Sequence, residues 1–151
     1  HVEAGTVVID GSLDNEDQEH RLRFTLGHEG GHGVLHPSYF LNTIGSSARD
    51  DTGIYVRCRS DFKVSGRDFS GFRSLTDAER AEQQANRFSA AVLMPRSAAK
   101  ILLAGRQYNR TEGWIISAME QISDTFNVSK EAAFYRLKGL EMIEEHAKMP
   151  F

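Results

Sequence analysis

The sequence predicts a single α+β domain over residues 1–151, in which a small antiparallel β-sheet packs on a helical core. Residues 6–9 (Thr-Val-Val-Ile) are typical of a short strand, and residues 54–59 alternate apolar and polar side chains. After residue 75, by contrast, apolar residues recur at helical spacing. A chain of 151 residues with 40% hydrophobic residues is long enough to bury one core.

Composition and charge exclude several classes of protein. A formal net charge of -3 gives no overall positive field that could hold nucleic acid. The apolar runs are only a few residues long, so we expect no membrane span. The single cysteine, Cys58, cannot form an internal disulfide, which excludes a disulfide-stapled secreted scaffold. Because no targeting segment is recognisable, we expect the protein to work in the cytoplasm.

The first helix is predicted over residues 16–35. Asn15 is a plausible N-cap, because Gln18 and acidic residues follow it in the first turn. The second half, residues 24–35, carries apolar side chains or glycine on nearly every face, which predicts burial all round. Pro37 ends the helix.

Residues 38–75 form the least regular part of the sequence. The polar stretch that follows the strand at 54–59 fits either a long loop or an extra hairpin. The remainder has the pattern of helices, with a helical C-terminal part over about 111–148. The helices are expected at about 76–95, 96–104, 112–126 and 130–138.

Three of these helices begin with a residue suited to capping. Thr76 and Glu79 form a capping box, and Thr111 and Ser129 are expected N-caps. Their apolar residues recur along one face of each helix, which is expected to meet the core. The residues on these faces are Ala78, Ala81, Ala85, Phe88, Val92, Ile115, Met119, Ile122, Phe126, Ala133, Leu137 and Leu140.

The pattern that carries chemistry is His28-Glu29-Gly30-Gly31-His32, an H-E-x-x-H motif in the first predicted helix. Helical residues four apart lie about 6 Å apart along the axis and about 40° apart around it, so both imidazoles can point at one metal ion. Zinc suits such a pair. Glu29 lies beside them, where it can take a proton from a water that zinc activates. We therefore predict one zinc ion held by His28 and His32, with Glu29 as general base.

A zinc site of this kind needs a third protein ligand and one open position. Glu79 already serves the capping box. Glu82 lies one turn further along, beside small alanines that let two helices approach closely. We therefore predict Glu82 as the third metal ligand, with Glu79 as the alternative. Asn86 follows Glu82 by one turn and either bonds a ligand imidazole or is an exposed polar residue.

Four other residues have both a structural and a functional interpretation. His36 lies about 12 Å along the axis from His28, too far to share a tetrahedral ion. We interpret it mainly as a residue of the helix C-terminus, with assistance to substrate as the alternative. Cys58 is either a small buried hydrophobe or a functional thiolate. Tyr39 and Tyr55 are either packing residues or donors to an oxyanion.

Two blocks of this sequence resemble motifs of the ImmA/IrrE-type metallopeptidases. Residues 23–32 (RFTLGHEGGH), followed by Leu-His at 35–36, are similar to the opening motif of that family. Residues 82–95 (EQQANRFSAAVLMP) resemble its E-x-x-A-N-x-F-A-A-x-L-L-M-P signature. A weaker block at 126–137 is similar to its helical C-terminal segment. The resemblance spans about residues 20–140.

The resemblance implies a zincin-like fold with a gluzincin-like zinc site, in which His28, His32 and Glu82 are ligands and Glu29 is the general base. It also implies an endopeptidase that cleaves a helix-turn-helix repressor by attack of water on the peptide carbonyl. The chain departs from the family pattern in a cluster of glycines within the first helix. Each glycine costs about 0.5–1 kcal/mol relative to alanine inside a helix, so metal ligation or close backbone packing should compensate. The glycines are Gly27, Gly30, Gly31 and Gly33.

Two other functions stay open at this point. A metal-bound module that holds a repressor without cleaving it would have the same ligands. A DNA-binding protein would use the helix pair at 112–126 and 130–138, which resembles a helix-turn-helix in outline. The second helix of this pair offers only Lys130, Arg136 and Lys138 to phosphates. We therefore expect the pair to pack the core or to hold a partner protein.

Overall fold

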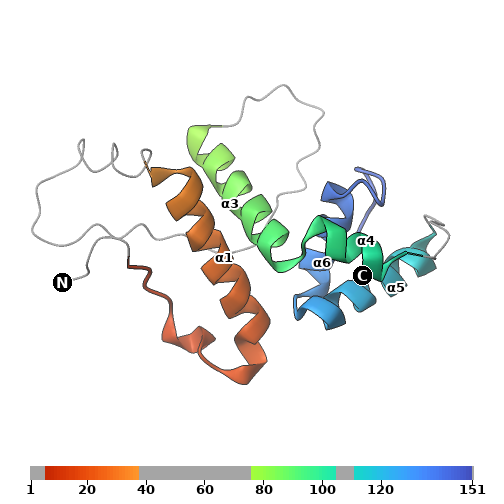
Figure 1. The fold of residues 1–151 in the computed structure, drawn as a ribbon, viewed down its shortest axis with the longest axis horizontal. Helices are drawn as coiled ribbons and strands as arrows, with labels where there is room; N and C mark the ends of the chain where they lie inside the picture. Colours follow the sequence, from red (N-terminus) through yellow and green to blue (C-terminus); the bar gives the residue numbers. More distant parts are fainter. Residues whose placement is uncertain (1–5, 38–75, 105–110, 151) are drawn as a thin grey trace, which may run out of the picture.

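The computed structural model describes residues 6–37, 76–104 and 111–150. Figure 1 shows two long helices, α1 and α3, side by side, and a group of helices, α4 to α6, at the far end of α3. None of the described helices combines the length and the apolar character needed to cross a lipid bilayer. The elements are η1 (Gly11–Leu13), η2 (Glu16–Gln18), α1 (Glu19–Leu35), α3 (Asp77–Leu93), α4 (Arg96–Leu102), α5 (Glu112–Phe126) and α6 (Lys130–Gly139).

The predicted α+β class with a small antiparallel sheet is wrong, because the described ranges contain helices and no strand. Residues 6–9 are irregular, and the side chains of Val7 and Val8 are 48% and 66% exposed. β-branched residues favour a strand only where a neighbouring strand and a core receive them, and here neither side chain is buried. The strand predicted at 54–59 lies outside the described residues, within the segment 38–75. So do Tyr39, Tyr55 and Cys58.

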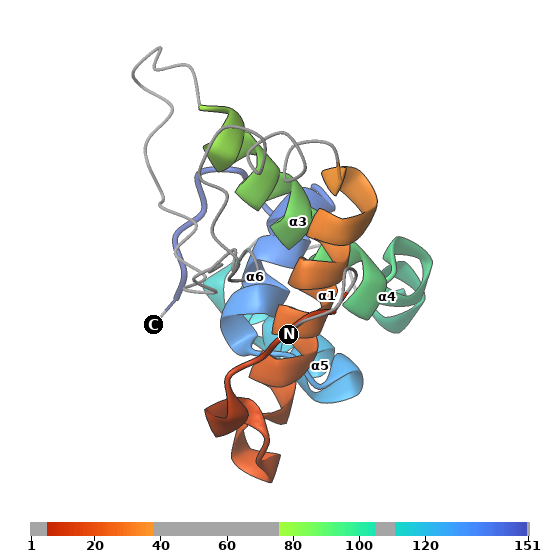
Figure 2. The same ribbon diagram turned by 90° about the vertical axis from the view of Figure 1, so that its left-hand side faces the viewer.

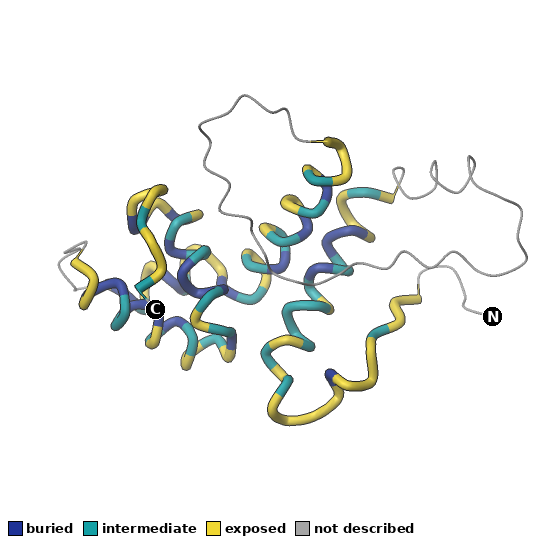
Figure 3. The backbone as a smooth tube through the Cα atoms, turned by 180° about the vertical axis from the view of Figure 1, so that it is seen from behind, coloured by how far each residue is buried: buried dark blue, intermediate teal, exposed yellow. Residues whose placement is uncertain are grey.

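Helix α1 begins at Glu19, because residues 16–18 form the separate 3₁₀ turn η2. Asn15 precedes that turn without a capping bond from its side chain. Burial all round the second half of α1 was a wrong prediction: Leu26 is 49% and Val34 is 65% exposed. Buried positions alternate with exposed ones along α1 and α3 (Figure 3), as expected for helices that bury one face.

The buried face of α1 meets α3 at two glycines. A Cβ atom at Gly31 would lie 3.1 Å from Ala85 Cα and 3.2 Å from Ala85 O, and one at Gly27 would lie 2.5 Å from Ser89 Oγ. The hydroxyl of Ser89 donates to the backbone oxygen of Phe24 at 2.9 Å, which ties the helices together. Close backbone packing therefore compensates for the cost of placing Gly27 and Gly31 inside a helix. It was one of the two predicted explanations, the other being metal ligation.

The inward stripe predicted for α3 is partly wrong. Ala81 and Ala85 are buried as expected, and the third buried residue is Ser89. Ala78 is exposed, and Val92 is 56% exposed. Both exposed residues lie near the ends of α3, where two helices that cross at an angle diverge from each other.

Alanine substitutions at Gly31 and Gly33 should change stability in opposite directions. A methyl group at Gly31 would press on the backbone of Ala85, so we expect Gly31→Ala to lower the free energy of unfolding by about 1–3 kcal/mol. Gly33 is exposed, and no described atom lies within 4 Å of the place that a Cβ atom would occupy there. Gly33→Ala should raise the free energy of unfolding by about 0.5–1 kcal/mol. Urea unfolding of both variants tests this, and equal effects would contradict the tight α1–α3 contact.

The predicted caps and core residues of the C-terminal helices are confirmed. The hydroxyl of Thr111 accepts from the backbone N–H of Trp114, and that of Ser129 accepts from Ala132. Phe126 is partly buried against the core. The other predicted inward residues of α5 and α6 are all buried, namely Ile115, Met119, Ile122, Ala133, Leu137 and Leu140.

Two arginines join the α1–α3 pair to the C-terminal helices. Arg23 of α1 donates to the backbone oxygens of Phe126 and Asn127 at 3.0 and 3.3 Å, at the end of α5. Arg136 of α6 donates to Met94 O at 2.9 Å, at the end of α3. Helix C-termini present unpaired carbonyls with partial negative charge, so guanidinium groups suit them. Figure 2 looks from the side of α1, with α5 and α6 behind it.

Candidate metal centre

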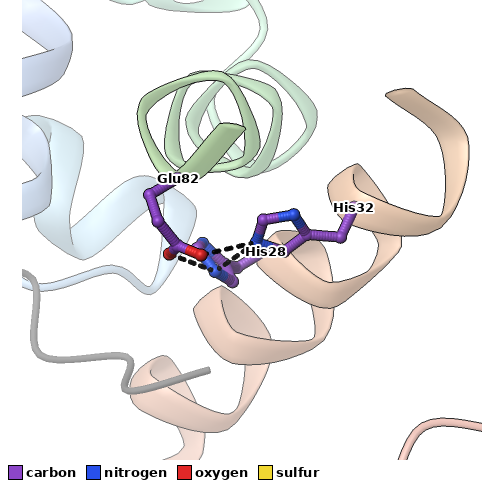
Figure 4. A group of neighbouring side chains, drawn as sticks. All are labelled: His28, His32 and Glu82. Atoms are coloured by element: carbon purple, nitrogen blue, oxygen red, sulfur yellow. Dashed lines mark hydrogen bonds and ion pairs between the residues drawn. The ribbon is translucent and has the colours of Figure 1, made fainter. Parts of the chain in front are cut away.

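Three side chains from α1 and α3 converge at the contact between these helices (Figure 4). His28 and His32 lie one turn apart on the buried face of α1, and Glu82 reaches them from α3. The Nε2 atoms of the two histidines are 3.0 Å apart. The Oε2 atom of Glu82 lies 3.3 Å from His28 Nε2, and its Oε1 atom lies 3.3 Å from His32 Nε2.

This triangle of atoms has the dimensions of a zinc site. Tetrahedral coordination with bonds of about 2.0–2.1 Å places neighbouring ligand atoms about 3.3 Å apart. The observed separations of 3.0, 3.3 and 3.3 Å are close to that value. The three residues could therefore hold one metal ion and leave a fourth position open.

Burial of the three side chains differs, and this gives the centre an open side. His28 is 2% and His32 is 4% exposed, whereas the side chain of Glu82 is 45% exposed. The imidazoles are therefore shielded by the two helices, while the carboxylate stands at the boundary with solvent.

Asn86 fixes the orientation of the His28 ring. Its side-chain oxygen lies 2.9 Å from His28 Nδ1. Because an amide oxygen only accepts, Nδ1 carries a proton, and in a neutral imidazole this leaves the lone pair of Nε2 toward His32 and Glu82. Of the two interpretations of Asn86, the bond to the imidazole is therefore the one that the structure contains.

The electrostatics of the triangle favour a cation at its centre. Burial, with added repulsion from His28 and His36, lowers the pKa of His32 from 6.5 to about 4. His32 is therefore neutral at pH 7. The Nε2 atoms of His28 and His32 and the two carboxylate oxygens of Glu82 thus face one another within 3.3 Å, and this set of nitrogen and oxygen atoms suits a divalent cation.

The two competing glutamates occupy different places. Glu79 Oε2 accepts from the backbone nitrogen of Thr76 at 2.9 Å and from its hydroxyl at 3.1 Å, so the predicted capping box is confirmed. Glu82, one turn further along α3, is the glutamate that lies at the histidine pair. Glu29 is half-buried and follows His28 on α1.

Sequence reasoning missed one hydrogen-bonded pair beside the centre. His36, the C-cap of α1, has its Nδ1 atom 3.2 Å from His32 Nδ1 and its Nε2 atom 2.8 Å from Gln84 Oε1. Its place at the helix end was predicted, but its contact with His32 was not. The spacing of four residues between His32 and His36 was the signal that could have found this contact. Nothing in the sequence singled out Gln84.

Comparisons with known proteins bear on the second sequence block. The family model described as the IrrE N-terminal-like domain, a peptidase family, matches residues 69–138. This range contains Glu82 and Asn86 and begins after the H-E-x-x-H motif. Searches of the curated proteins and of the solved structures gave no match. The match confirms the resemblance drawn from the motifs for this part of the chain: residues 69–138 are similar to the IrrE N-terminal-like domain.

Proposed function

We propose that this protein is a zinc-dependent endopeptidase, with His28, His32 and Glu82 as the zinc ligands and Glu29 as the general base. The observation that carries the proposal is the triangle of Nε2 and carboxylate oxygen atoms, with separations of 3.0–3.3 Å. The similarity of residues 69–138 to a peptidase family supports hydrolysis of a peptide bond as the reaction. One ion per chain is expected, because one such triangle occurs among the described residues.

Different side chains of the protein have different roles in the proposed hydrolysis. A bound zinc ion supplies a Lewis acid that polarises the peptide carbonyl and makes water a nucleophile near neutral pH. Glu29 would accept a proton from the attacking water and donate it to the departing amine. Asn86 holds the His28 ring in place, so that its lone pair points to the centre of the triangle.

We propose a helix-turn-helix transcriptional repressor as the substrate. This proposal rests on the resemblance of the two sequence blocks to the ImmA/IrrE-type peptidases and on the family match at 69–138. An enzyme that cleaves a repressor would meet it in the cytoplasm, which agrees with the location expected from the sequence. Loss of the repressor would switch on the genes under its control.

The contacts of α6 favour a role in packing over DNA binding. Lys130 pairs with Glu120 at 2.9 Å, and Arg136 donates to the end of α3. The ammonium group of Lys138 lies 5.2 Å from the centre of the Phe134 ring. Each of the three basic residues that a recognition helix would offer to phosphates therefore has a partner within the protein.

A cleavage assay tests the proposed activity. The protein, loaded with zinc, should cut one of the repressors encoded beside its own gene, and a chelator should stop the reaction until zinc is restored. A readout by mass spectrometry would also identify the cleaved bond. Binding of a repressor without cleavage would instead support the non-cleaving module. Protein that binds no zinc at all would remove the basis of the proposal.

A further inference from the structure

We propose that Gln84 and His36 are positioning residues, which hold His32 in the tautomer that can bind a metal ion through Nε2. The inference rests on the proposed function in one respect, since it takes His32 to be a ligand of zinc. The observation behind it is a chain of two short contacts. Gln84 Oε1 lies 2.8 Å from His36 Nε2, and His36 Nδ1 lies 3.2 Å from His32 Nδ1.

The direction of this chain follows from what each atom can donate. The amide oxygen of Gln84 only accepts, so in a neutral imidazole of His36 the Nε2 atom carries the proton. His36 Nδ1 then has a lone pair, and the proton between the two rings belongs to His32 Nδ1. His32 Nε2 is left with a lone pair, which faces Glu82 and His28. If the amide nitrogen of Gln84 faced His36, every donor would reverse and a proton would block His32 Nε2.

The structural task of His36 leaves its ring available for this role. As the C-cap of α1, His36 uses its backbone N–H, which donates to His32 O at 2.9 Å. The imidazole makes its contacts with Gln84 and His32 separately from that bond. A plain helix-ending residue would not need a ring whose two nitrogens both have polar partners.

Helix α3 thus supplies an acceptor for each of the two histidines. Asn86 accepts directly from His28, while Gln84 acts on His32 through the intervening ring of His36. Partners of this kind fix ring orientation and tautomer in metal sites, and their loss typically weakens metal binding about 10- to 100-fold. The correct tautomer of both imidazoles therefore depends on the docking of α3 against α1.

The test compares substitutions at Gln84 with the same substitutions at Gln83, which is an exposed neighbour on α3. Gln84 is also exposed, so none of these changes should affect folding. Gln84→Met removes the acceptor and should weaken zinc binding about 10- to 100-fold, measured by competition with a chromophoric chelator. Gln84→Glu keeps an acceptor and should bind zinc at least as tightly as the wild type. Gln83→Met should leave the affinity unchanged.

Nitrogen NMR of the metal-free protein measures the tautomer directly. His32 should carry its proton on Nδ1 in the wild type and in Gln84→Glu. In Gln84→Met the proton should be shared between Nδ1 and Nε2. This measurement needs no zinc, so it tests the inference even if the proposed zinc site were wrong. An unchanged His32 tautomer in Gln84→Met would overturn the inference.

A last comparison separates the hydrogen-bond chain from simple charge. Added negative charge attracts zinc from any nearby position, so Gln83→Glu gives the effect of charge alone. In a His36→Phe background the hydrogen-bond chain from Gln84 to His32 is broken. Gln84→Glu should then raise the zinc affinity no more than Gln83→Glu does. Equal zinc affinities for the wild type and Gln84→Met would refute the positioning role. Absence of zinc binding in the wild type would refute the proposed function instead.

Discussion

Replacing Glu29 with glutamine should abolish peptide cleavage while zinc stays bound. Glutamine has nearly the shape of glutamate, but its amide cannot accept a proton from water. Loss of general acid–base catalysis typically lowers a rate by about 10²- to 10⁴-fold. The ligand triangle does not include residue 29, so elemental analysis should still find about one zinc per chain. Cleavage rates and zinc content are to be measured on the same preparation.

Glu19→Gln is the matched control for this experiment. Glu19 is exposed at the first position of the same helix, more than two turns before the histidines. The same chemical change there should leave both rate and zinc content at their wild-type values. A Glu29→Gln variant that cleaves at the normal rate would contradict the role of general base. A variant that loses zinc would make Glu29 a ligand.

Replacing Glu82 with alanine should remove the stabilisation that zinc gives to the folded protein. A ligand that binds only the native state stabilises it by about 2.7 kcal/mol at 100 times its dissociation constant. Without Glu82 only the two imidazoles remain in the triangle, and two protein ligands hold zinc far more weakly than three. The midpoint of thermal unfolding should therefore rise with zinc for the wild type and stay constant for Glu82→Ala.

Glu79→Gln is the control for Glu82→Ala, because Glu79 is the other glutamate of α3. Glutamine can replace glutamate in a capping box, so the helix should still begin at Asp77. The response of the melting temperature to zinc should match that of the wild type. If Glu82→Ala kept the full zinc response, the third ligand would have to lie elsewhere.

The helices of the second half could be predicted because their signals are local. Thr76, Thr111 and Ser129 each cap a helix through a bond to the backbone three residues ahead. Such bonds form within one turn of chain and need no partner from another element. The apolar positions of α5 and α6 were equally informative, because residues of both helices belong to one buried cluster.

Two predictions that depended on a distant partner failed. The β-branched residues 6–9 have strand propensity, yet two of their side chains are largely exposed and the segment is irregular. The glycine-rich half of α1 has apolar residues on every side, which gave no information about the side that α3 covers. Side-chain composition describes what a segment can bury, and only the neighbouring element decides what it does bury.

The sequence alone determined that His28 and His32 share one face of a helix, because the geometry of an α-helix brings residues four apart together. It also determined that Glu79 would cap α3. Tertiary structure decided which other groups meet the histidine pair. Gly27 and Gly31 let α3 approach α1 closely, and that contact fixes how the two helices align. The alignment sets the positions of the α3 side chains around the imidazoles, which are those of Glu82, Gln84 and Asn86.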